Sequence, residues 1–358
     1  MKKLDIYIIK KFLGTFFYAI SLLILVVIVI DISEKIDDFL EKDAPLMDII
    51  FVYYVNFIPY FVNLFLYLFT FIAVIFFTSK MASNTEFVAI LSGGVSFRRL
   101  LFPYLLSAII LSLLSFYLAN WLIPQTSAKR RAFINTYVEK LSRDKDRNIH
   151  FQTKPGTFAY IDNYNTSNNI GYKFSLEKFN KNGLYYQMHA EQIKWDTVRG
   201  AWIIKDYFIR EIDGLEEKIR RGKILDTIVN VAPSDFIIDH RNYEVMDFSQ
   251  LKQYIIREKS KGASDLQFYE VEKYKRVAYP FATIILTIIG VSLSSRKVKG
   301  GIGLHLGFGI AISFAFILFM QISTVFATYG NLPPIIAVWI PNLIFGALAV
   351  YLYKIAPK

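Results

Sequence analysis

A short segment beginning at Ser83 reads Ser-Asn-Thr-Glu-Phe-Val-Ala-Ile-Leu-Ser-Gly-Gly, and it combines a charge with apolar residues in a way that suits docking. Ser83 and Glu86 have the spacing of a capping box, and the two glycines predict where a helix ends. This helix carries Phe87, Ile90 and Leu91 on a loop, where water would otherwise meet them. It either docks in a groove of another protein, with Glu86 facing an arginine or lysine, or lies on lipid headgroups. The residues themselves leave both alternatives open.

Three consecutive basic residues, Lys129, Arg130 and Arg131, follow the sequence Trp-Leu-Ile-Pro-Gln at the end of a long apolar stretch. Guanidinium and ammonium groups are the usual protein ligands of phosphate, so the cluster suits phosphate recognition. The alternative is a solvated helix face that pairs with the acidic residues of segment 31–48. Lys35 lies within that acidic segment, where it either contacts a phosphorylated ligand or forms a salt bridge with its neighbours.

Several other kinds of chemistry lack the residues they need. The chain has no cysteine, which excludes disulfides, thiolate metal sites and cysteine nucleophiles. It has no Gly-x-x-x-x-Gly-Lys-Ser/Thr phosphate loop and no His-Glu-x-x-His motif, and its 4 histidines are scattered. We therefore predict no catalytic residue, no metal and no cofactor. The net charge of +11 comes without a nucleic-acid-binding motif, so anionic lipid is the expected partner and nucleic acid is not.

These residues must be positioned by long apolar helices, because 54% of the 358 residues are hydrophobic. A charge at the centre of a bilayer costs about 2.5–3.5 kcal/mol, so windows without formal charge mark membrane spans. Six such windows are long enough to span, and they cover residues 12–30, 49–79, 100–127, 277–295, 303–328 and 335–353. No cleavage pattern follows the first window, so we expect an uncleaved helix. No span carries Asp, Glu, Lys or Arg at its centre, so the energy for transport should come from a partner.

The distribution of lysine and arginine in the short loops predicts which side each loop faces. The basic segments contain Lys2, Lys3, Lys10 and Lys11, then Lys80, Arg98 and Arg99, and finally Arg296, Lys297 and Lys299. They alternate with an acidic segment at 31–48, with the long insert, and with an uncharged break at 329–334. Both chain ends and the loop helix are therefore expected in the cytoplasm. The insert is expected outside it.

The insert changes from helical to strand periodicity. Apolar and polar residues alternate between frequent turn signals, which predicts an antiparallel meander, sandwich or jelly roll. The period turns helical again at about 248–261. We thus expect a membrane α+β protein in three parts. Residues 1–130 hold three spans with a cytoplasmic helix at about 83–93, residues 131–265 form the outward β domain and its return helix, and residues 266–358 hold three more spans.

Three small residues, Gly303, Gly307 and Ala311, recur at every fourth position of the fifth window. This spacing allows another helix to approach closely. Because such patterns are common, we expect the approaching helix to belong to the same chain.

Four motifs, taken in order, resemble those of the LptF/LptG (YjgP/YjgQ) family of permeases, and the match runs nearly from end to end. The motifs are Glu86-Phe-Val-Ala-Ile-Leu-Ser-Gly-Gly-Val-Ser96, Trp121-x-x-Pro124-Gln125, Glu272-Lys-Tyr-Lys-Arg-x-x-x-Pro280, and Gly330-Asn-Leu-Pro-Pro334 with Trp339-x-Pro341-Asn342. Each motif alone is weak, but together they fit the predicted topology. The resemblance implies a membrane subunit of the ABC transporter that extracts lipopolysaccharide from the bacterial inner membrane.

The resemblance also implies partners and site residues. The partners are a second permease of the same family, a cytoplasmic ATPase dimer, and a single-span protein that completes a periplasmic bridge of jelly rolls like the inserted domain. By position, Glu86 enters the ATPase groove with Phe87, Ile90 and Leu91, and Arg131, with Lys129 and Arg130, meets lipid A phosphates. Lys35 corresponds loosely to a lysine that some members carry at the outer end of the first helix. The chain itself carries no nucleotide-binding site and is expected not to be an enzyme.

Two functions of other classes also fit the residues. One is a lipid flippase or secondary transporter that works alone. The other is a non-transporting envelope scaffold that docks through its outward domain. Purification in mild detergent separates the first from the transporter subunit, because only the subunit should elute with an ATPase.

Overall fold

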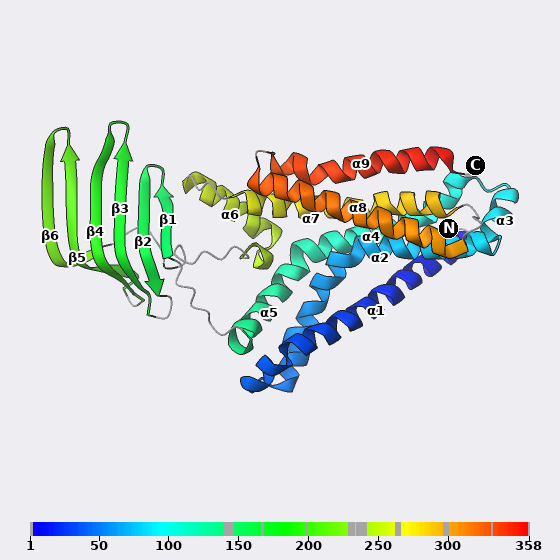
Figure 1. The fold of residues 1–358 in the computed structure, drawn as a ribbon, viewed down its shortest axis with the longest axis horizontal. Helices are drawn as coiled ribbons and strands as arrows, with labels where there is room; N and C mark the ends of the chain where they lie inside the picture. Colours follow the sequence, from blue (N-terminus) through cyan, green and yellow to red (C-terminus); the bar gives the residue numbers. More distant parts are fainter. Residues whose placement is uncertain are drawn as a thin grey trace. The chain divides into compact units, whose positions relative to one another are not determined.

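A computed structural model describes residues 3–138, 147–165, 168–197, 199–227, 233, 242–261, 266–295, 301–330 and 332–356 (Figure 1). The chain divides into two compact units. The helical unit comprises Met1–Val138, Tyr243–Leu251 and Gln267–Lys358, and the β unit comprises Glu139–Asn242 and Lys252–Leu266.

Among the described residues, 6 helices are long and apolar enough to cross a membrane, as predicted. They are α1 (Lys3–Glu41), α2 (Val55–Ser83) with the π-helical turns η1 (Asp48–Tyr54) before it, α4 (Phe97–Tyr117) continued by η2 (Leu118–Leu122) and α5 (Ile123–Tyr137), α7 (Gln267–Ser294), α8 (Gly301–Tyr329) and α9 (Pro334–Ile355). The short helix α3 (Glu86–Ser92) lies between α2 and α4. Figure 1 shows the start of α1 and the end of α9 at the same end of this unit as α3, in agreement with an even number of spans.

Helices α2 and α7 pack closely at the centre of the helical unit. A Cβ atom added at Gly290 of α7 would lie 2.9 Å from Cγ1 of Val74 and 3.1 Å from the ring of Phe71, both on α2. Val74 and Phe71 are themselves fully buried. Glycine is therefore required at this crossing, because any larger residue would push the two helices apart.

We expect the substitution Gly290→Ala to lower the free energy of unfolding by about 1–3 kcal/mol, because it overpacks this crossing. Thermal unfolding of the purified protein in detergent measures the effect. Gly346→Ala in α9 is the matched control, since a Cβ atom there has nothing within 4 Å. Its expected effect is neutral or a gain of about 0.5–1 kcal/mol from the lower chain entropy of alanine. Equal unfolding midpoints for the two variants would contradict close packing at Gly290.

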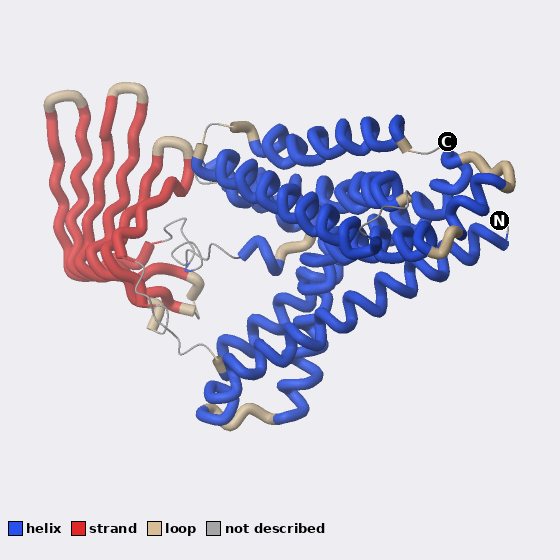
Figure 2. Tube along the Cα trace, turned by 45° about the vertical axis from the view of Figure 1, so that its right-hand side comes forward, coloured by secondary structure: helices blue, strands red, loops and turns tan. Residues whose placement is uncertain are grey.

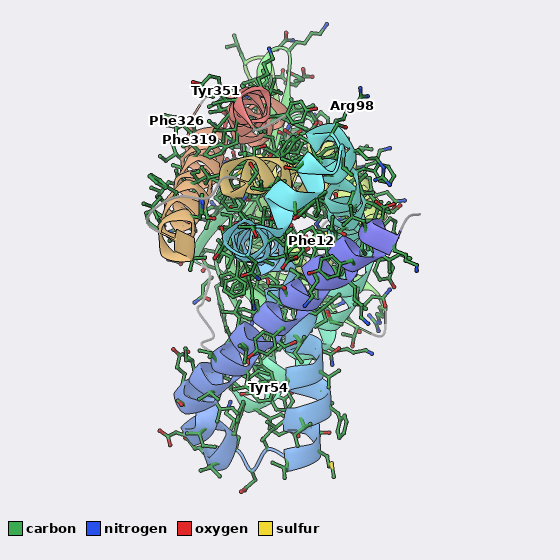
Figure 3. The ribbon with its side chains drawn as sticks, turned by 90° about the vertical axis from the view of Figure 1, so that its right-hand side faces the viewer. Phe12, Tyr54, Arg98, Phe319, Phe326 and Tyr351 are labelled. Atoms are coloured by element: carbon green, nitrogen blue, oxygen red, sulfur yellow. The ribbon has the colours of Figure 1, made fainter. Side chains whose placement is uncertain are left out.

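The small residues of α8 pack against none of the described residues, contrary to the prediction. Cβ atoms added at Gly303 and Gly307 have nothing within 4 Å, and Ala311 is exposed. Gly309, on another side of the helix, makes the close contact instead, with Ile75 of α2. Farther along α8, Phe319 and Phe326 lie at the edge of the helical unit (Figure 3). No described residue of the chain thus covers the face with small residues.

The β unit contains a six-stranded antiparallel sheet in the order β1-β2-β3-β4-β5-β6. Its strands are β1 (Arg147–Lys154), β2 (Thr157–Asn165), β3 (Ile170–Asn180), β4 (Gly183–Asp196), β5 (Ala201–Asp213) and β6 (Glu216–Thr227). Of the three arrangements that the sequence left open, the described strands form a meander, in one curved sheet (Figure 2). The predicted alternation places Ile161, Phe174, Met188 and Ile204 together in a core on one face.

The last strand in the described part of this sheet, β6, carries an ordered row of charges. Two acidic residues come first, four basic residues follow, and an acidic residue lies near the end; they are Glu216, Glu217, Lys218, Arg220, Arg221, Lys223 and Asp226. Arg210 of β5 donates a hydrogen bond of 3.1 Å to Glu217, and this bond lowers the pKa of the Glu217 carboxyl group. Glu217 therefore keeps its charge under mildly acidic conditions.

The predicted return helix is confirmed as α6 (Phe248–Lys261), which follows the short 3₁₀ helix η4 (Asn242–Val245). A capping box starts it. The backbone N–H of Gln250 donates to the Asp247 carboxylate at 2.8 Å, and the backbone N–H of Asp247 donates to the Gln250 side chain at 3.0 Å. This reciprocal pair fixes where the helix begins.

Candidate functional site

The start of the loop helix α3 differs from the prediction, and its end agrees with it. Ser83 is the last residue of α2, and Thr85, with φ of 61° and no side-chain cap, precedes α3. The predicted capping box is therefore wrong, because α2 remains helical through Ser83. At the other end Gly94, with φ of 83°, donates its N–H to the Leu91 carbonyl at 3.0 Å. Glycine suits this left-handed position, so the predicted helix stop is confirmed.

The apolar residues of α3 are divided between the interior of the chain and its surface. Phe87 is fully buried, and its ring centroid lies 6.3 Å from that of Phe97 in α4. Ile90 and Leu91 are half-buried against the same core, and Val88 is 51% exposed. The expectation that Phe87 needs an external partner was wrong, because the first turn of α4 covers it. The open apolar surface of α3 includes Val88, Ala89 and the outer parts of Ile90 and Leu91.

Two polar contacts connect α3 and α4 to the first turns of α1. The Glu86 carboxylate accepts hydrogen bonds from the Tyr7 hydroxyl at 3.1 Å and from the Asn84 amide at 3.3 Å. The guanidinium group of Arg99 in α4 donates two hydrogen bonds of 2.7 Å to Asp5, which is 2% exposed. A buried carboxylate requires such a partner, so α1 and α4 are held together here. Glu86 remains partly accessible.

Helix α5 carries the predicted phosphate-binding residues, and it points them in different directions. Lys129 is exposed, whereas Arg130 and Arg131 are half-buried. Consecutive helical residues are about 100° apart around the axis, so the three side chains do not converge on one point. The Arg130 guanidinium carbon lies 5.2 Å from the ring centroid of Tyr60 and 5.9 Å from that of Phe57. Its Nε atom is buried and has no hydrogen-bond partner.

Lys35 belongs to a polar cluster between α1 and η1. It forms an ion pair with Asp31 and donates a hydrogen bond of 2.6 Å to the Tyr53 hydroxyl. The Asp31 carboxylate also accepts hydrogen bonds from Tyr53 at 2.9 Å and from Tyr54 at 3.2 Å. Figure 3 shows Tyr54 beside α1. The structure thus contains the salt bridge that the sequence offered as one alternative for Lys35, and the two tyrosines are partners that the sequence did not indicate.

One aromatic cluster connects these two regions. The Tyr53 ring centroid lies 5.8 Å from that of Phe57 and 5.4 Å from that of Phe133 in α5. Phe57 in turn contacts Arg130. Lys35 and Arg130 therefore lie on the same group of aromatic side chains.

A cavity of about 300 Å³ lies within the helical unit, where α7 begins. Its lining comes mainly from α2, α4, η2, α7 and η4, and its polar members include Tyr60, Asn63, Ser115, Glu244, Glu272 and Lys275. Arg276, which is 5% exposed, donates hydrogen bonds of 2.7 Å to the carbonyls of Tyr243 and Met246 and one of 3.1 Å to Glu272. The sequence did not identify this cavity, although its Glu-Lys-Tyr-Lys-Arg motif was recognised. In the described part of the chain, no group of three or more His, Asp or Glu residues is arranged to hold a metal ion.

Comparison with known proteins gives two matches. The family model described as "Lipopolysaccharide export system permease LptF/LptG" matches residues 6–355. An "Uncharacterized protein" of Aquifex aeolicus (strain VF5) is 24% identical over 301 residues, which are 81% of this chain and 81% of that protein. The family match covers nearly the whole chain, including α3, α5 and the cavity. The chain is a multi-pass membrane protein that belongs to the LptF/LptG family of lipopolysaccharide export permeases, and it is not itself an ATPase.

Proposed function

We propose that the chain is one of two permease subunits of an ABC transporter that extracts lipopolysaccharide from the bacterial inner membrane, with a separate cytoplasmic ATPase dimer supplying the energy. The observation that carries this proposal is the family match over residues 6–355. The six apolar helices and the inserted sheet suit a lipid cargo that leaves the membrane on the side of the β unit. In this arrangement both termini and α3 face the cytoplasm and the β unit faces the periplasm.

Helix α3 is the element that receives force from the ATPase. Its partly accessible Glu86 suits an arginine or lysine at the rim of a groove, and the outer parts of Ile90 and Leu91 suit the groove itself. Phe87 serves from inside, because it anchors α3 to α4. Since α1 is bonded to Glu86 through Tyr7, movement of α3 also acts on α1.

The basic residues in the middle of α5 and near the end of α1 contact the phosphates of lipid A. Lys129 is exposed and Arg131 is half-buried, while Arg130 faces the aromatic cluster. Lys35 already pairs with Asp31 and Tyr53, so a phosphate would have to compete with both. We therefore assign Lys35 a weaker role than the α5 residues.

The second permease of the heterodimer packs against the open face of α8. Gly303, Gly307 and Ala311 leave room there for the close approach of a helix. The β unit passes the lipid to a periplasmic bridge of similar domains, which a single-span partner completes. Moving an acyl chain out of hydrocarbon costs about 0.8 kcal/mol per CH₂, so a sheltered apolar route is needed. The apolar face of the sheet suits that route.

Purification of the tagged chain from its native membranes in mild detergent, followed by reconstitution into proteoliposomes that contain lipopolysaccharide, tests the proposal. We expect an ATPase and a second permease to elute with the chain, and we expect lipopolysaccharide release that requires ATP. A flippase or secondary transporter working alone would elute without an ATPase. A scaffold would release no lipid and would capture none with crosslinkers placed near Arg131. Either result would contradict the proposal.

A further inference from the structure

We propose that the cavity at the start of α7 binds the phosphate group of a lipid headgroup, with Lys275 as its main ligand and Arg130, which lies beside the lining residue Tyr60, as a second cation. This inference rests on the proposed function. It adds a binding site inside one chain and names a residue that recognises the lipid cargo. The site is separate from the exposed Lys129 and the half-buried Arg131 on α5.

Lys275 is a cation in a cavity without a counter-ion in contact. Its side chain lines the cavity, and its Nζ atom lies 6.0 Å from the ring centroid of Tyr279. Among the described residues, Lys275 makes no hydrogen bond and no ion pair, although the Glu272 carboxylate lies near enough to attract its charge. An ammonium group at the edge of a membrane span is expensive to keep unless it serves a ligand or a partner. The absence of a hydrogen bond and of an ion pair therefore points to an anionic ligand.

The neighbouring carboxylates do not fill this role. Glu272 forms an ion pair of 3.1 Å with Arg276, which also binds two backbone carbonyls. These two charges balance each other. Glu244 lines the same cavity and has interactions of its own, but the structure contains no ion pair between it and Lys275.

A second cation, Arg130, lies beside a residue that lines the cavity. Tyr60 lines the cavity on one side, and the Arg130 guanidinium carbon lies 5.2 Å from the centroid of its ring. The Arg130 Nε atom is buried without an acceptor, so this side chain also has unused hydrogen-bonding capacity. The two positive charges of Arg130 and Lys275 exceed the single negative charge of Glu244 by one. Two cationic donors from different helices are a common arrangement for phosphate.

The position along the helices matches the level of lipid headgroups. Lys275 precedes the uncharged window 277–295 by two residues, and Arg130 follows the window 100–127 by three residues. At 1.5 Å per residue, both lie within roughly 5 Å of the ends of the apolar segments. Headgroup phosphates lie just outside the hydrocarbon core of the bilayer. Leu64, Ile123 and Pro280 also line the cavity, and they offer apolar surface to the carbon atoms next to the phosphate.

The test measures binding of fluorescent bisphosphorylated lipid A to the purified full-length permease with its co-purifying subunits. We expect Lys275→Gln to weaken this binding at least tenfold, because a charge-assisted hydrogen bond is lost. Lys275→Arg should bind within threefold of the wild type. Lys273→Gln is the matched control, since it removes the same charge two residues away on α7 from a side chain that does not line the cavity. It should leave binding unchanged.

Removing the phosphates from lipid A should remove the difference between the wild type and Lys275→Gln. Competition with phosphatidylglycerol and with inorganic phosphate distinguishes the source of the phosphate. If phosphatidylglycerol displaces lipid A from the wild type in a way that depends on Lys275, the site accepts any lipid phosphate. If phosphatidylglycerol does not displace it, the site prefers lipid A. Displacement by inorganic phosphate alone at micromolar concentration would overturn the assignment to a lipid headgroup.

Glu244→Gln keeps the proposal testable even if Lys275→Gln does not fold. If the cavity holds a phosphate, removing the Glu244 charge should tighten or preserve lipid A binding. If Glu244 is instead the functional partner of Lys275, its loss should weaken binding as the loss of Lys275 does, and the proposal is wrong. Equal lipid A affinity of the wild type and Lys275→Gln also overturns it while leaving the proposed function intact. Failure of the wild type to bind lipid A would instead count against the proposed function.

Discussion

Replacing Glu86 by lysine is expected to reduce ATP-dependent lipopolysaccharide release from proteoliposomes by at least a hundredfold. Glu86 is partly accessible on α3, so the proposed ATPase contact meets its charge directly. Truncating one partner of a buried interface charge pair costs about 2–5 kcal/mol, and reversing the charge adds repulsion. Since 1.4 kcal/mol is a factor of about ten in affinity, docking of the ATPase should fail. Release assays and co-elution of the ATPase both measure this effect.

Two conservative variants separate docking from local structure. Tyr7→Phe removes the hydrogen bond that Glu86 accepts from α1 and keeps the carboxylate, so co-elution of the ATPase should persist. Glu86→Gln keeps an acceptor for Tyr7 and removes the charge, so it should weaken co-elution. If the lysine variant released lipid at the wild-type rate, α3 would not be the ATPase contact. If Tyr7→Phe alone abolished co-elution, the role of Glu86 would be to position α1 rather than to bind the ATPase.

Replacing Arg276 by methionine is expected to lower the free energy of unfolding of the helical unit by about 3–5 kcal/mol. Removal of one partner from a buried, hydrogen-bonded charge pair typically has this effect. Methionine fills a similar volume but leaves the carbonyls of Tyr243 and Met246 and the Glu272 carboxylate without the Arg276 donor. Thermal unfolding in detergent measures the loss. Limited proteolysis should show earlier cleavage near residues 243–246, which Arg276 holds against α7.

Arg276→Lys is the informative comparison for this prediction. Lysine keeps the positive charge, but its single nitrogen cannot reproduce the arrangement in which separate guanidinium nitrogens reach Tyr243, Met246 and Glu272. Its unfolding midpoint should fall between those of the methionine variant and the wild type. If methionine at this position had no effect on unfolding or cleavage, the contacts of Arg276 would not hold the returning chain.

The membrane helices were predictable because a charged side chain inside the bilayer is costly. Each span therefore appears in the sequence as a long run of residues without formal charge. Five of the six uncharged windows proved to lie inside longer helical segments, as in α1, which extends from Lys3 to Glu41, and the window 277–295 covers the later part of α7. The helices continue because polar residues at their ends find partners, such as Asp5 with Arg99. Strand alternation in the insert was predictable for a similar reason, since one face of the sheet is buried. The order of the strands depends on which strands pair with each other. Residue patterns alone did not decide this, so a meander, a sandwich and a jelly roll all remained possible.

The candidate sites were harder to predict because they depend on contacts between distant residues. Asp31 meets Tyr53 and Tyr54 across a turn, and Arg276 meets a segment that returns from the β unit. No spacing rule relates these positions. The loop helix shows a local failure of another kind. Its Ser-x-x-Glu spacing matches a capping box, yet α2 continues through that serine, whereas the Asp-x-x-Gln spacing at Asp247 forms the real one.

The row of charges on β6 also limits how two copies of the chain can associate. Strand-to-strand pairing of β6 with itself, antiparallel and centred between Arg221 and Gly222, would place Arg220 opposite Lys223. The same alignment would place Glu217 opposite Asp226. Like charges directly opposite each other destabilise a ladder, so this full-length alignment is disfavoured at β6, the last strand in the described part of the sheet.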